Sequence, residues 1–229
     1  MLIATKNNMG FMSTAIDPVC GKFINKHAKT AGKILDIGAA YGVTTFPFLE
    51  VGCSVTAVDM EAKHLEELQE NAPNSGLLTT ITAKFPDELN FPDDTFDAII
   101  ISRVLHFLEG ELIIAGLKKI KRWLKPEAEL FILTETPFIK TLGRLRKEFL
   151  ERKVAGEKWP GSFNDFPSYE EPHLGNLPYY INLQDQDTLS AALLESGLKI
   201  QEITYVSRSD FPEHMLLDGR ESIAAIATK

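Results

Sequence analysis

Short apolar runs alternate along the first 135 residues with longer segments in which apolar residues recur every three or four positions. Runs of the first kind predict buried strands, and segments of the second kind predict amphipathic helices. Strands are predicted at residues 33–37, 54–59, 78–83, 97–102 and 129–134, and helices at 14–30, 42–52, 62–71 and 111–124. This alternation predicts a mostly parallel sheet with helices on both faces.

The pattern changes after Glu135. Residues 139–154 carry a helical stripe of apolar side chains, and residues 156–182 are rich in proline, glycine and aromatic residues. A connection of that length inside a compact domain is usually functional or disordered, and its aromatic content argues against disorder. We interpret residues 136–185 as an insertion over the carboxyl edge of the sheet that forms a substrate lid. The alternative is a packed surface elaboration away from any site.

The remaining residues predict the end of the sheet. A helix is expected at 188–196, and two alternating segments, 199–207 and 222–228, are expected to be closing strands, with one antiparallel strand at the edge. We expect one domain over residues 1–229. Its parts are an N-terminal helical cap (1–31), a ligand-binding core (32–135), the lid (136–185) and the closing helix and strands (186–229).

Two strand ends carry the clearest chemistry. The run 33–37 stops at Gly38-Ala39-Ala40-Tyr41-Gly42, and the run 54–59 stops at Asp59. Glycines let bare backbone approach a ligand, and the following helix directs free N–H groups at it. The carboxylate of Asp59 can accept two hydrogen bonds from a ribose diol at the neighbouring strand end. The sequence therefore predicts a nucleotide site at this edge.

The spacing of the small residues separates two classes of nucleotide site. The dinucleotide fingerprint places glycines at relative positions one, three and six, with an acid about 20 residues on. Here the small residues Gly38, Ala40 and Gly42 stand at positions one, three and five, and position six is Val43. Asp59 fits either class.

The pattern from Asp36 to Gly42, followed by a strand ending in Asp59, resembles the class I S-adenosylmethionine-dependent methyltransferases. Residues 91–100, in which Phe96-Asp97 precedes an apolar strand, resemble the entry to the fourth strand of that family, and residues 104–108 resemble the segment that follows in its small-molecule branch, of the type 11 or type 12 kind. The resemblance covers about residues 32–135. It implies a three-layer Rossmann-like α/β fold with a seven-stranded, mostly parallel sheet.

The resemblance also implies roles for single residues. The turn holds the methionine end of S-adenosylmethionine, Asp59 holds the ribose, and Met60 is placed to touch the adenine, although a core methionine fits that position as well. The implied cofactor-binding residues are Asp36, Gly38, Ala39, Ala40, Gly42, Asp59, Met60, Lys84, Phe85, Ser102 and Arg103.

Two positions depart from the family pattern. Ala40 replaces the middle glycine, where a small residue is sufficient. The family commonly has an acid after the third strand to meet the adenine amino group, and this chain has Lys84-Phe85 there. The base is then held by backbone groups and the Phe85 ring, or Asp87 reaches it.

Methyl transfer requires alignment of the acceptor and, for hydroxyl or amine acceptors, removal of a proton. His106 is the candidate base, because histidine titrates near neutral pH and this one follows the fourth strand. His173 and His214 are the next candidates. A histidine at position 106 can equally pack against the next helix, and transfer by proximity alone needs no base.

The lid offers aromatic residues for substrate binding, namely Trp159, Tyr179 and Tyr180. Its segment 176–179 reads Asn-Leu-Pro-Tyr, which resembles a signature of adenine-N6 methyltransferases. That signature belongs at the end of the fourth strand, whereas here it follows the fifth, so an aromatic loop over a small substrate is the preferred interpretation.

The net charge of the chain limits the kinds of partner that it is expected to bind. The formal net charge of −8 argues against broad non-specific nucleic-acid binding. Residues 139–158 nevertheless hold seven basic and three acidic side chains, a local charge of +4. This segment could bind an anionic acceptor, acidic lipid or RNA, or it could be the solvated face of an amphipathic helix.

Composition is ordinary for a globular protein, with 44% hydrophobic and 24% charged residues. Cys20 and Cys53 have neither metal-ligand nor disulfide spacing, so no metal site is predicted. No signal peptide is visible in residues 1–15 and no apolar run approaches ~18 residues, so a cytoplasmic location is expected.

The sequence thus predicts a methyltransferase that uses S-adenosylmethionine, yields S-adenosylhomocysteine and methylates an O, N or C atom of a small-molecule acceptor. The alternatives are an RNA- or protein-modifying methyltransferase and a cofactor-binding protein without methyl transfer. Acceptor identity and oligomeric state are left open by the sequence.

Overall fold

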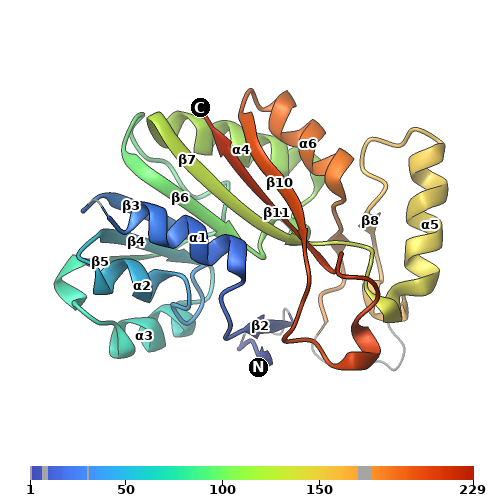
Figure 1. The fold of residues 1–229 in the computed structure, drawn as a ribbon, viewed down its shortest axis with the longest axis horizontal. Helices are drawn as coiled ribbons and strands as arrows, with labels where there is room; N and C mark the ends of the chain where they lie inside the picture. Colours follow the sequence, from blue (N-terminus) through green and yellow to red (C-terminus); the bar gives the residue numbers. More distant parts are fainter. Residues whose placement is uncertain (1, 7–9, 30, 170–176) are drawn as a thin grey trace.

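A computed structural model describes residues 2–6, 10–29, 31–169 and 177–229. Its centre is a seven-stranded sheet with the strand order β10-β11-β7-β6-β3-β4-β5 (Figure 1). The strands are β3 (Lys33–Ile37), β4 (Ser54–Asp59), β5 (Leu78–Thr82), β6 (Phe96–Ser102), β7 (Leu124–Glu135), β10 (Lys199–Val206) and β11 (Ser222–Thr228). Strands β3 to β7 are mutually parallel, which confirms the predicted three-layer, mostly parallel fold.

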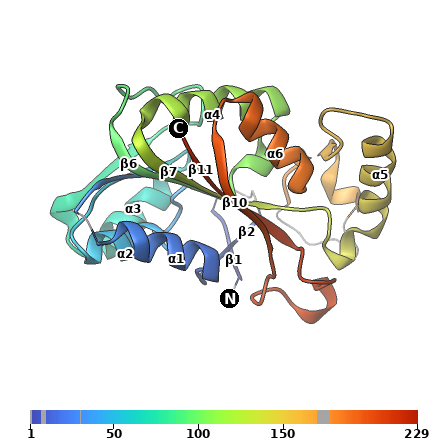
Figure 2. The same ribbon diagram turned by 45° about the horizontal axis from the view of Figure 1, so that its top comes forward.

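Helices cover both faces of the sheet (Figures 1 and 2). One face carries α1 (Pro18–His27), α2 (Thr45–Glu50) and α3 (Ala62–Asn71), and the other carries α4 (Gly110–Trp123) and α6 (Gln186–Glu195). Short 3-10 turns lie at Ser75–Leu77, Leu105–Phe107, Lys140–Leu142, Phe166–Tyr169 and Glu213–Met215. Among the described residues no helix is long and apolar enough to cross a bilayer.

Side-chain periodicity explains the layers. In α4, Ile113, Leu117 and Ile120 recur on one stripe and are buried against the sheet. In β6, Ile99 belongs to the same core as that stripe, and its neighbour Ile100 belongs to the core under α1 and α2. The continuous apolar run of β6, residues 98–101, is therefore covered on both faces, as parallel sheets require.

The antiparallel strand is β11, one place in from the edge. It pairs antiparallel with β7 on one side and with β10 on the other. The expectation of an antiparallel strand was correct, but its position at the edge was wrong. The physical reason is composition: β11 is nearly all apolar and buried, whereas β10 alternates polar and apolar residues and suits a half-exposed edge.

The N-terminal helix is shorter than predicted. Residues 14–17 are not helical, and the helix begins at Pro18 because the side chain of Asp17 accepts hydrogen bonds from the backbone N–H groups of Val19 and Cys20. Before it lies a hairpin that the sequence pattern did not predict, formed by β1 (Leu2–Ala4) and β2 (Phe11–Ser13). A helical cap over 1–31 is therefore correct only for its second half.

The segment after β7 forms a satellite beside the sheet. It contains α5 (Gly143–Val154) and a short pair of antiparallel strands, β8 (Ser162–Phe163) and β9 (Ile181–Asn182). Its apolar side chains, among them Leu145, Phe149 and Phe163, form a small core of their own, separate from the sheet's core. Figure 1 shows α5 standing to one side of the sheet. We call residues 136–169 and 177–185 the lid.

Candidate functional site

A cavity of about 610 Å³ opens at the carboxyl ends of the parallel strands. The turn after β3, the end of β4 and the segments that follow β5, β6 and β7 contribute to its walls. The N-terminal hairpin, the lid and the β10–β11 connection complete the enclosure. Ligands of open parallel sheets bind at this edge, and the volume falls in the range of cofactor and small-molecule sites.

The turn after β3 has left-handed backbone at three positions. Gly38, Ala40 and Gly42 have φ values of 77°, 44° and 89°, a region that favours glycine. A Cβ on Gly38 would lie 2.2 Å from Cγ2 of Val104, so a side chain cannot fit. Ala40 shows that the middle position tolerates a methyl group while keeping the left-handed bend. Gly38, Ala39 and Ala40 line the cavity; Gly42 is not among its lining residues.

Asp59 ties the two strand ends together. Its Oδ2 accepts the backbone N–H of Ala40 at 2.9 Å, and its Oδ1 accepts the backbone N–H of Glu61 at 2.9 Å. The residue is 7% exposed and lines the cavity. A carboxylate has about four acceptor positions, so capacity remains for a ligand hydroxyl.

His64 braces this carboxylate from α3. Its Nδ1 lies 3.1 Å from Oδ1 of Asp59, and the Tyr41 ring packs edge-on against it at 4.8 Å. Its other ring nitrogen, Nε2, is buried and has no hydrogen-bond partner within the described part of the chain. Sequence reasoning missed this residue. The available signal was a histidine in the first turn of the helix that follows Asp59.

Asp36 lies beneath the turn, not on the cavity wall. Its Oδ2 accepts hydrogen bonds from the hydroxyls of Thr44 and Thr45, both at 2.7 Å, and its Oδ1 has no partner within the described residues. Burial raises the pKa of Asp36 to about 6. The structure thus gives Asp36 a bracing position at the start of α2.

The other predicted cofactor residues reach the cavity. Met60 lines it at 53% exposure, and Phe85 lines it as a buried ring. The remaining predicted residues on its wall are Lys84, Ser102 and Arg103. Asp87, the alternative partner for the base, is not among the lining residues.

His106 lies on the cavity wall, with Nδ1 3.3 Å from the hydroxyl of Thr134. Burial, with smaller effects from nearby arginines, lowers the pKa of His106 to about 4. The ring is therefore neutral at pH 7, and its low basicity makes it a weak general base. His214 also lines the cavity, and His173 lies outside the described residues.

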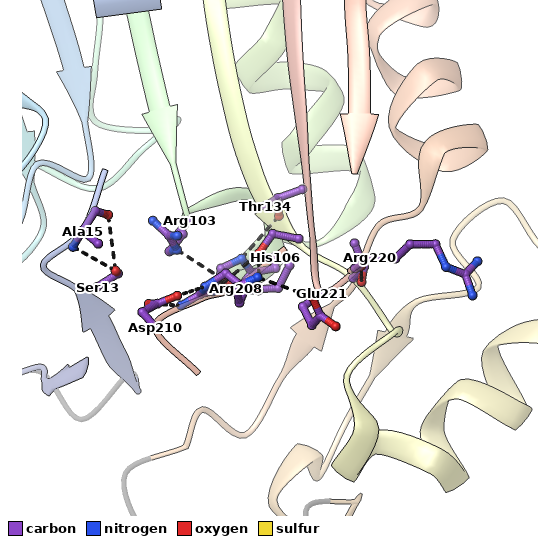
Figure 3. Close-up of polar contacts among 12 residues, drawn as sticks. Ser13, Ala15, Arg103, His106, Thr134, Arg208, Asp210, Arg220 and Glu221 are labelled. Carbon is purple, nitrogen blue, oxygen red and sulfur yellow. Dashed lines mark hydrogen bonds and ion pairs between the residues drawn. The ribbon is translucent and has the colours of Figure 1, made fainter. Parts of the chain in front are cut away.

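Two arginines, Arg103 and Arg208, line the cavity together with Glu135, and Asp210 lies against Arg208 (Figure 3). Arg208 pairs with Asp210 through two hydrogen bonds of 2.9 and 3.0 Å and also bonds Glu135. Nε of Arg103 lies 3.4 Å from Oε1 of Glu135. Sequence reasoning missed Arg208, Glu135 and Asp210, because residues 135 and 208 meet only through the β7–β11 pairing.

The predicted aromatic lid residues lie away from the cavity. Trp159 packs on Gly110, where a Cβ would come within 2.0 Å of the indole. Tyr179 is 67% exposed, and the hydroxyl of Tyr180 bonds Oγ of Ser162 at 3.0 Å. The lid residues that do line the cavity are Ile139, Leu142, Phe166, Leu177, Pro178, Ile181 and Leu183. The lid contacts the cavity through aliphatic groups and one phenylalanine, whereas Trp159 packs on α4 and the hydroxyl of Tyr180 bonds within the lid. Asn176 of the Asn-Leu-Pro-Tyr segment lies outside the described residues.

Most basic side chains of residues 139–158 have partners inside the molecule. Lys153 pairs with Asp185 and Asp187, and Lys158 pairs with Glu111 and Glu195. Further intramolecular partners are Glu148 for Arg152, the Ser168 carbonyl for Arg144, the Ile139 carbonyl for Arg146 and Glu151 for Lys147. The local excess of positive charge is therefore largely compensated by the fold.

Residues 34–127 match the family model of the methyltransferase domain. This range contains the turn after β3, Asp59 and His106, which the geometry brings to one edge of the sheet. The chain therefore contains a methyltransferase domain over this range.

Curated relatives of this methyltransferase domain cover part of the chain. Cypemycin N-terminal methyltransferase from a Streptomyces species is 33% identical over 126 residues, which are 53% of this chain and 50% of that protein. Ubiquinone biosynthesis O-methyltransferase from Bartonella bacilliformis is 30% identical over 103 residues, 44% of this chain and 40% of that protein. The chain spans about half or less of the length of these relatives.

Solved structures share the fold over nearly the whole chain. An S-adenosylmethionine-dependent methyltransferase from Methanosarcina mazei has a TM-score of 0.66 at 20% identity, covering 93% of this chain and 98% of its own. The 1,6-didemethyltoxoflavin-N1-methyltransferase of Burkholderia thailandensis, solved with its substrate and S-adenosylhomocysteine, has a TM-score of 0.63 at 17% identity, covering 93% and 77%. The methyltransferase fold therefore extends through the lid and β11.

S-adenosylmethionine is the cofactor of this methyltransferase domain, and the residues of the cavity fit it. The left-handed turn leaves no room for a side chain at Gly38, so backbone can contact a ligand. Asp59 retains acceptor capacity for a ligand hydroxyl such as one of a ribose, and the buried Nε2 of His64 lacks a hydrogen-bond partner within the described chain. Met60 and Phe85 offer apolar contact for a base.

Proposed function

We propose that this protein transfers a methyl group from S-adenosylmethionine to an O, N or C atom of a small-molecule acceptor held in the cavity under the lid. The observation that carries the proposal is one continuous cavity that joins the Gly38 turn and Asp59 to the apolar residues of the lid. A binding site for the cofactor and space for an acceptor thus share one enclosure.

The chain's own groups support binding, alignment and exclusion of water. The left-handed turn and Asp59 fix one end of the site, since both are held by backbone hydrogen bonds. When bound, S-adenosylmethionine supplies an electrophilic methyl group on a sulfonium. The lid covers the acceptor side with Phe166, Ile181 and Leu183, which exclude water from the reacting groups.

His106 has a limited role in this proposal. It is neutral at pH 7 and can accept a hydrogen bond from an acceptor, but a pKa of about 4 gives it little driving force for proton removal. The site therefore suits acceptors that lose their proton easily or have none to lose at the methylated atom.

Modification of RNA has less support than methylation of a small molecule. The basic side chains of residues 139–158 are largely paired with carboxylates and carbonyls of the same chain, which reduces the positive potential that RNA binding requires. A salt-sensitive gel shift with RNA that is lost on neutralising Lys147 and Arg144 would favour the RNA-modifying alternative.

The proposed function is tested in two steps. Calorimetry measures binding of S-adenosylhomocysteine and of NAD; the first is expected to bind and the second not to bind. The protein is then incubated with S-adenosylmethionine labelled in its methyl group and with either the low-molecular-weight or the macromolecular fraction of a cell extract. Label is expected in small organic products from the first fraction. Label only in protein or RNA would overturn the small-molecule assignment, and binding without any transfer would support a cofactor-binding protein.

A further inference from the structure

Arg103 and Arg208 stand side by side at the end of the cavity and differ in how completely they are bonded (Figure 3). The guanidinium of Arg208 donates hydrogen bonds to Asp210, Glu135 and Ser222. The guanidinium of Arg103 makes no hydrogen bond within the described part of the chain, and its buried Nε has only the ion pair with Glu135 at 3.4 Å. Its ion-pair partner is Glu135, whose oxygens already accept from Arg208 and Ser222. Arg208, Asp210 and Asp17 also lie close enough to act on the charge of Arg103.

An arginine with five N–H donors and no hydrogen bond is unusual when it is largely removed from water. Its side chain is 19% exposed, and the exposed part faces the cavity that it lines. Buried polar groups in native proteins are paired in the great majority, so an unpaired one calls for an explanation. A guanidinium presents its donors as a planar fork that fits the two oxygens of a carboxylate.

The backbone of Arg103 gives a second, independent indication. Its φ is +58°, a left-handed conformation that is uncommon for residues other than glycine and asparagine. The strain is held in place by a hydrogen bond of 2.6 Å from the backbone N–H of Arg103 to the carbonyl of Leu133 on β7. Residues held in such conformations gather at ligand sites. This backbone bend directs the arginine from the end of β6 towards β7 and the β10–β11 connection.

That direction separates Arg103 from the ribose end of the cofactor site. Asp59 ends β4, two strands from β6 in the sheet, whereas Glu135 and Arg208 belong to the opposite half of the sheet. Most of the wall on this half is apolar, and Glu135, Arg208, His106 and His214 are among its polar groups. It includes Phe11, Phe107, Leu142, Phe166, Phe211 and Met215. An acceptor here meets mostly hydrocarbon and one incompletely bonded cation.

The charged groups at this end of the cavity balance one another. Arg103 and Arg208 balance Glu135 and Asp210, and Asp17 is engaged as the cap of α1, where it accepts two backbone N–H groups. Glu221 accepts the backbone N–H groups of Leu217, Asp218 and Gly219 and is compensated there. Because these groups supply no surplus of positive charge, a dianion such as a phosphate monoester would be less well compensated here than a singly charged group that uses the free donors of Arg103.

We propose that Arg103 binds the carboxylate of an otherwise apolar acceptor and thereby sets the substrate class of this enzyme. The inference rests on the proposed function, because it places the acceptor in the same cavity. The guanidinium acts as a specificity-determining anchor for one end of the molecule, and the apolar wall binds the remainder.

The test uses the full chain saturated with S-adenosylhomocysteine and titrated with decanoate, decanamide and decyl phosphate. The wild-type protein is expected to bind decanoate at least about tenfold more tightly than decanamide, which has the same shape without the charge. Arg103→Met is expected to lose that preference. Arg122→Met is the matched control, because Arg122 is an exposed arginine paired with Asp93 on the surface, and it is expected to keep the preference.

A folding defect in Arg103→Met would not obscure the result. Arg103→Gly removes the guanidinium while suiting the left-handed φ, so it is expected to fold at least as well as wild type and to lose the same preference. Equal binding of decanoate and decanamide by the wild-type protein would overturn the proposal. Tighter binding of decyl phosphate would overturn the assignment of a carboxylate.

A carboxylate could also come from the amino-acid end of the cofactor. Comparison of S-adenosylhomocysteine with 5′-methylthioadenosine, which lacks that end, distinguishes the two sources. If Arg103 binds the acceptor, Arg103→Gly leaves the affinity for both nucleosides unchanged. A loss confined to S-adenosylhomocysteine would assign Arg103 to the cofactor and overturn the acceptor role. Failure of wild-type protein to bind either nucleoside would instead contradict the proposed function itself.

Discussion

The carboxylate of Asp59 accepts the backbone N–H of Ala40 at 2.9 Å. The acid at the end of β4 thus holds the left-handed turn after β3 before any ligand is bound. Gly38 and Ala39 add hydrogen bonds of 2.8 and 3.0 Å from their backbone N–H groups to the carbonyl of Val58. The two strand ends therefore form one pre-organised unit, which reduces the entropy lost on binding.

Replacing Asp59 by alanine is expected to weaken S-adenosylhomocysteine binding by on the order of 1.5–3 kcal/mol, the range for hydrogen bonds to charged groups. The loss has two causes, a missing ribose contact and a loosened turn at Ala40. Isothermal calorimetry measures it. Asp93→Ala, at an exposed surface ion pair, serves as the control. Unchanged affinity in a folded Asp59→Ala protein would remove the ribose assignment.

Gly38→Ala is expected to destabilise the protein and abolish cofactor binding, because the added Cβ would lie 2.2 Å from Val104. Gly52→Ala is the matched control: its φ of +89° is equally left-handed, but no atom lies within 4 Å of the added Cβ. For Gly52→Ala the free energy of unfolding is expected to fall by only about 1 kcal/mol, the cost of a left-handed backbone at a residue that has a Cβ. Urea denaturation compares the two, and equal losses would show that packing against Val104 is unimportant.

Between pH 4 and 6.5 the free energy of unfolding should depend on pH because of His106. Burial lowers the pKa of His106 to about 4, so in this range the unfolded chain binds more protons than the folded one. The contribution of this residue is complete above pH 6.5 and is lost as the pH falls, on the order of 3 kcal/mol in all. Denaturation of His106→Gln at several pH values should show this pH dependence removed. An unchanged slope would contradict the burial effect.

The effect of Asp36 on the free energy of unfolding should change with pH in the opposite direction to that of His106. The pKa of Asp36 is raised to about 6, so between pH 4 and 6 the folded protein binds more protons than the unfolded chain. Stability from this residue is present at low pH and is lost as the pH rises through 6. In Asp36→Asn the free energy of unfolding should therefore increase more from pH 4 to 6 than in wild type. A decrease relative to wild type over that range would show that Asp36 is ionised at low pH in the fold.

Trp159→Ala is expected to lower the free energy of unfolding, because the indole covers Gly110 at the start of α4. The loss should fall below the roughly 3–5 kcal/mol of a fully buried tryptophan, since Trp159 is only partly buried. The affinity for S-adenosylhomocysteine should stay within twofold of wild type, since Trp159 does not line the cavity. Tyr179→Ala, at an exposed position, should change neither quantity. Loss of cofactor affinity in Trp159→Ala without loss of stability would show that Trp159 takes part in ligand binding.

The sequence pattern predicted the sheet well because its strands are buried on both faces. The bounds of β3, β4, α3 and β11 agree with the predicted ranges, and each begins or ends at a sharp change from apolar to polar or small residues. The hairpin β1–β2 was missed because each strand has only three residues and the connection is polar. Alternation over so short a run carries no signal.

Side-chain partners over long separations were beyond sequence reasoning. Arg208 and Glu135 are joined only because β11 pairs with β7, and a different strand order would part them. Trp159 was assigned to the acceptor from composition, and the structure shows that an aromatic loop can instead serve its own packing. Asp59 could be assigned to the cofactor edge because consecutive parallel strands end at the same edge of a sheet.

The position of β11 between β7 and β10 has a consequence for how the chain folds. The free edge of β7 is paired only when β11, residues 222–228, joins the sheet. The lid and α6 lie between these two strands in the sequence, so the sheet is completed only after they have been made. Contacts at such separation are slow to form. During that interval the edge of β7, with the apolar run Leu130–Leu133, is open to pairing with another chain. The chain is therefore expected to be most prone to aggregation in the stage before its final strand inserts.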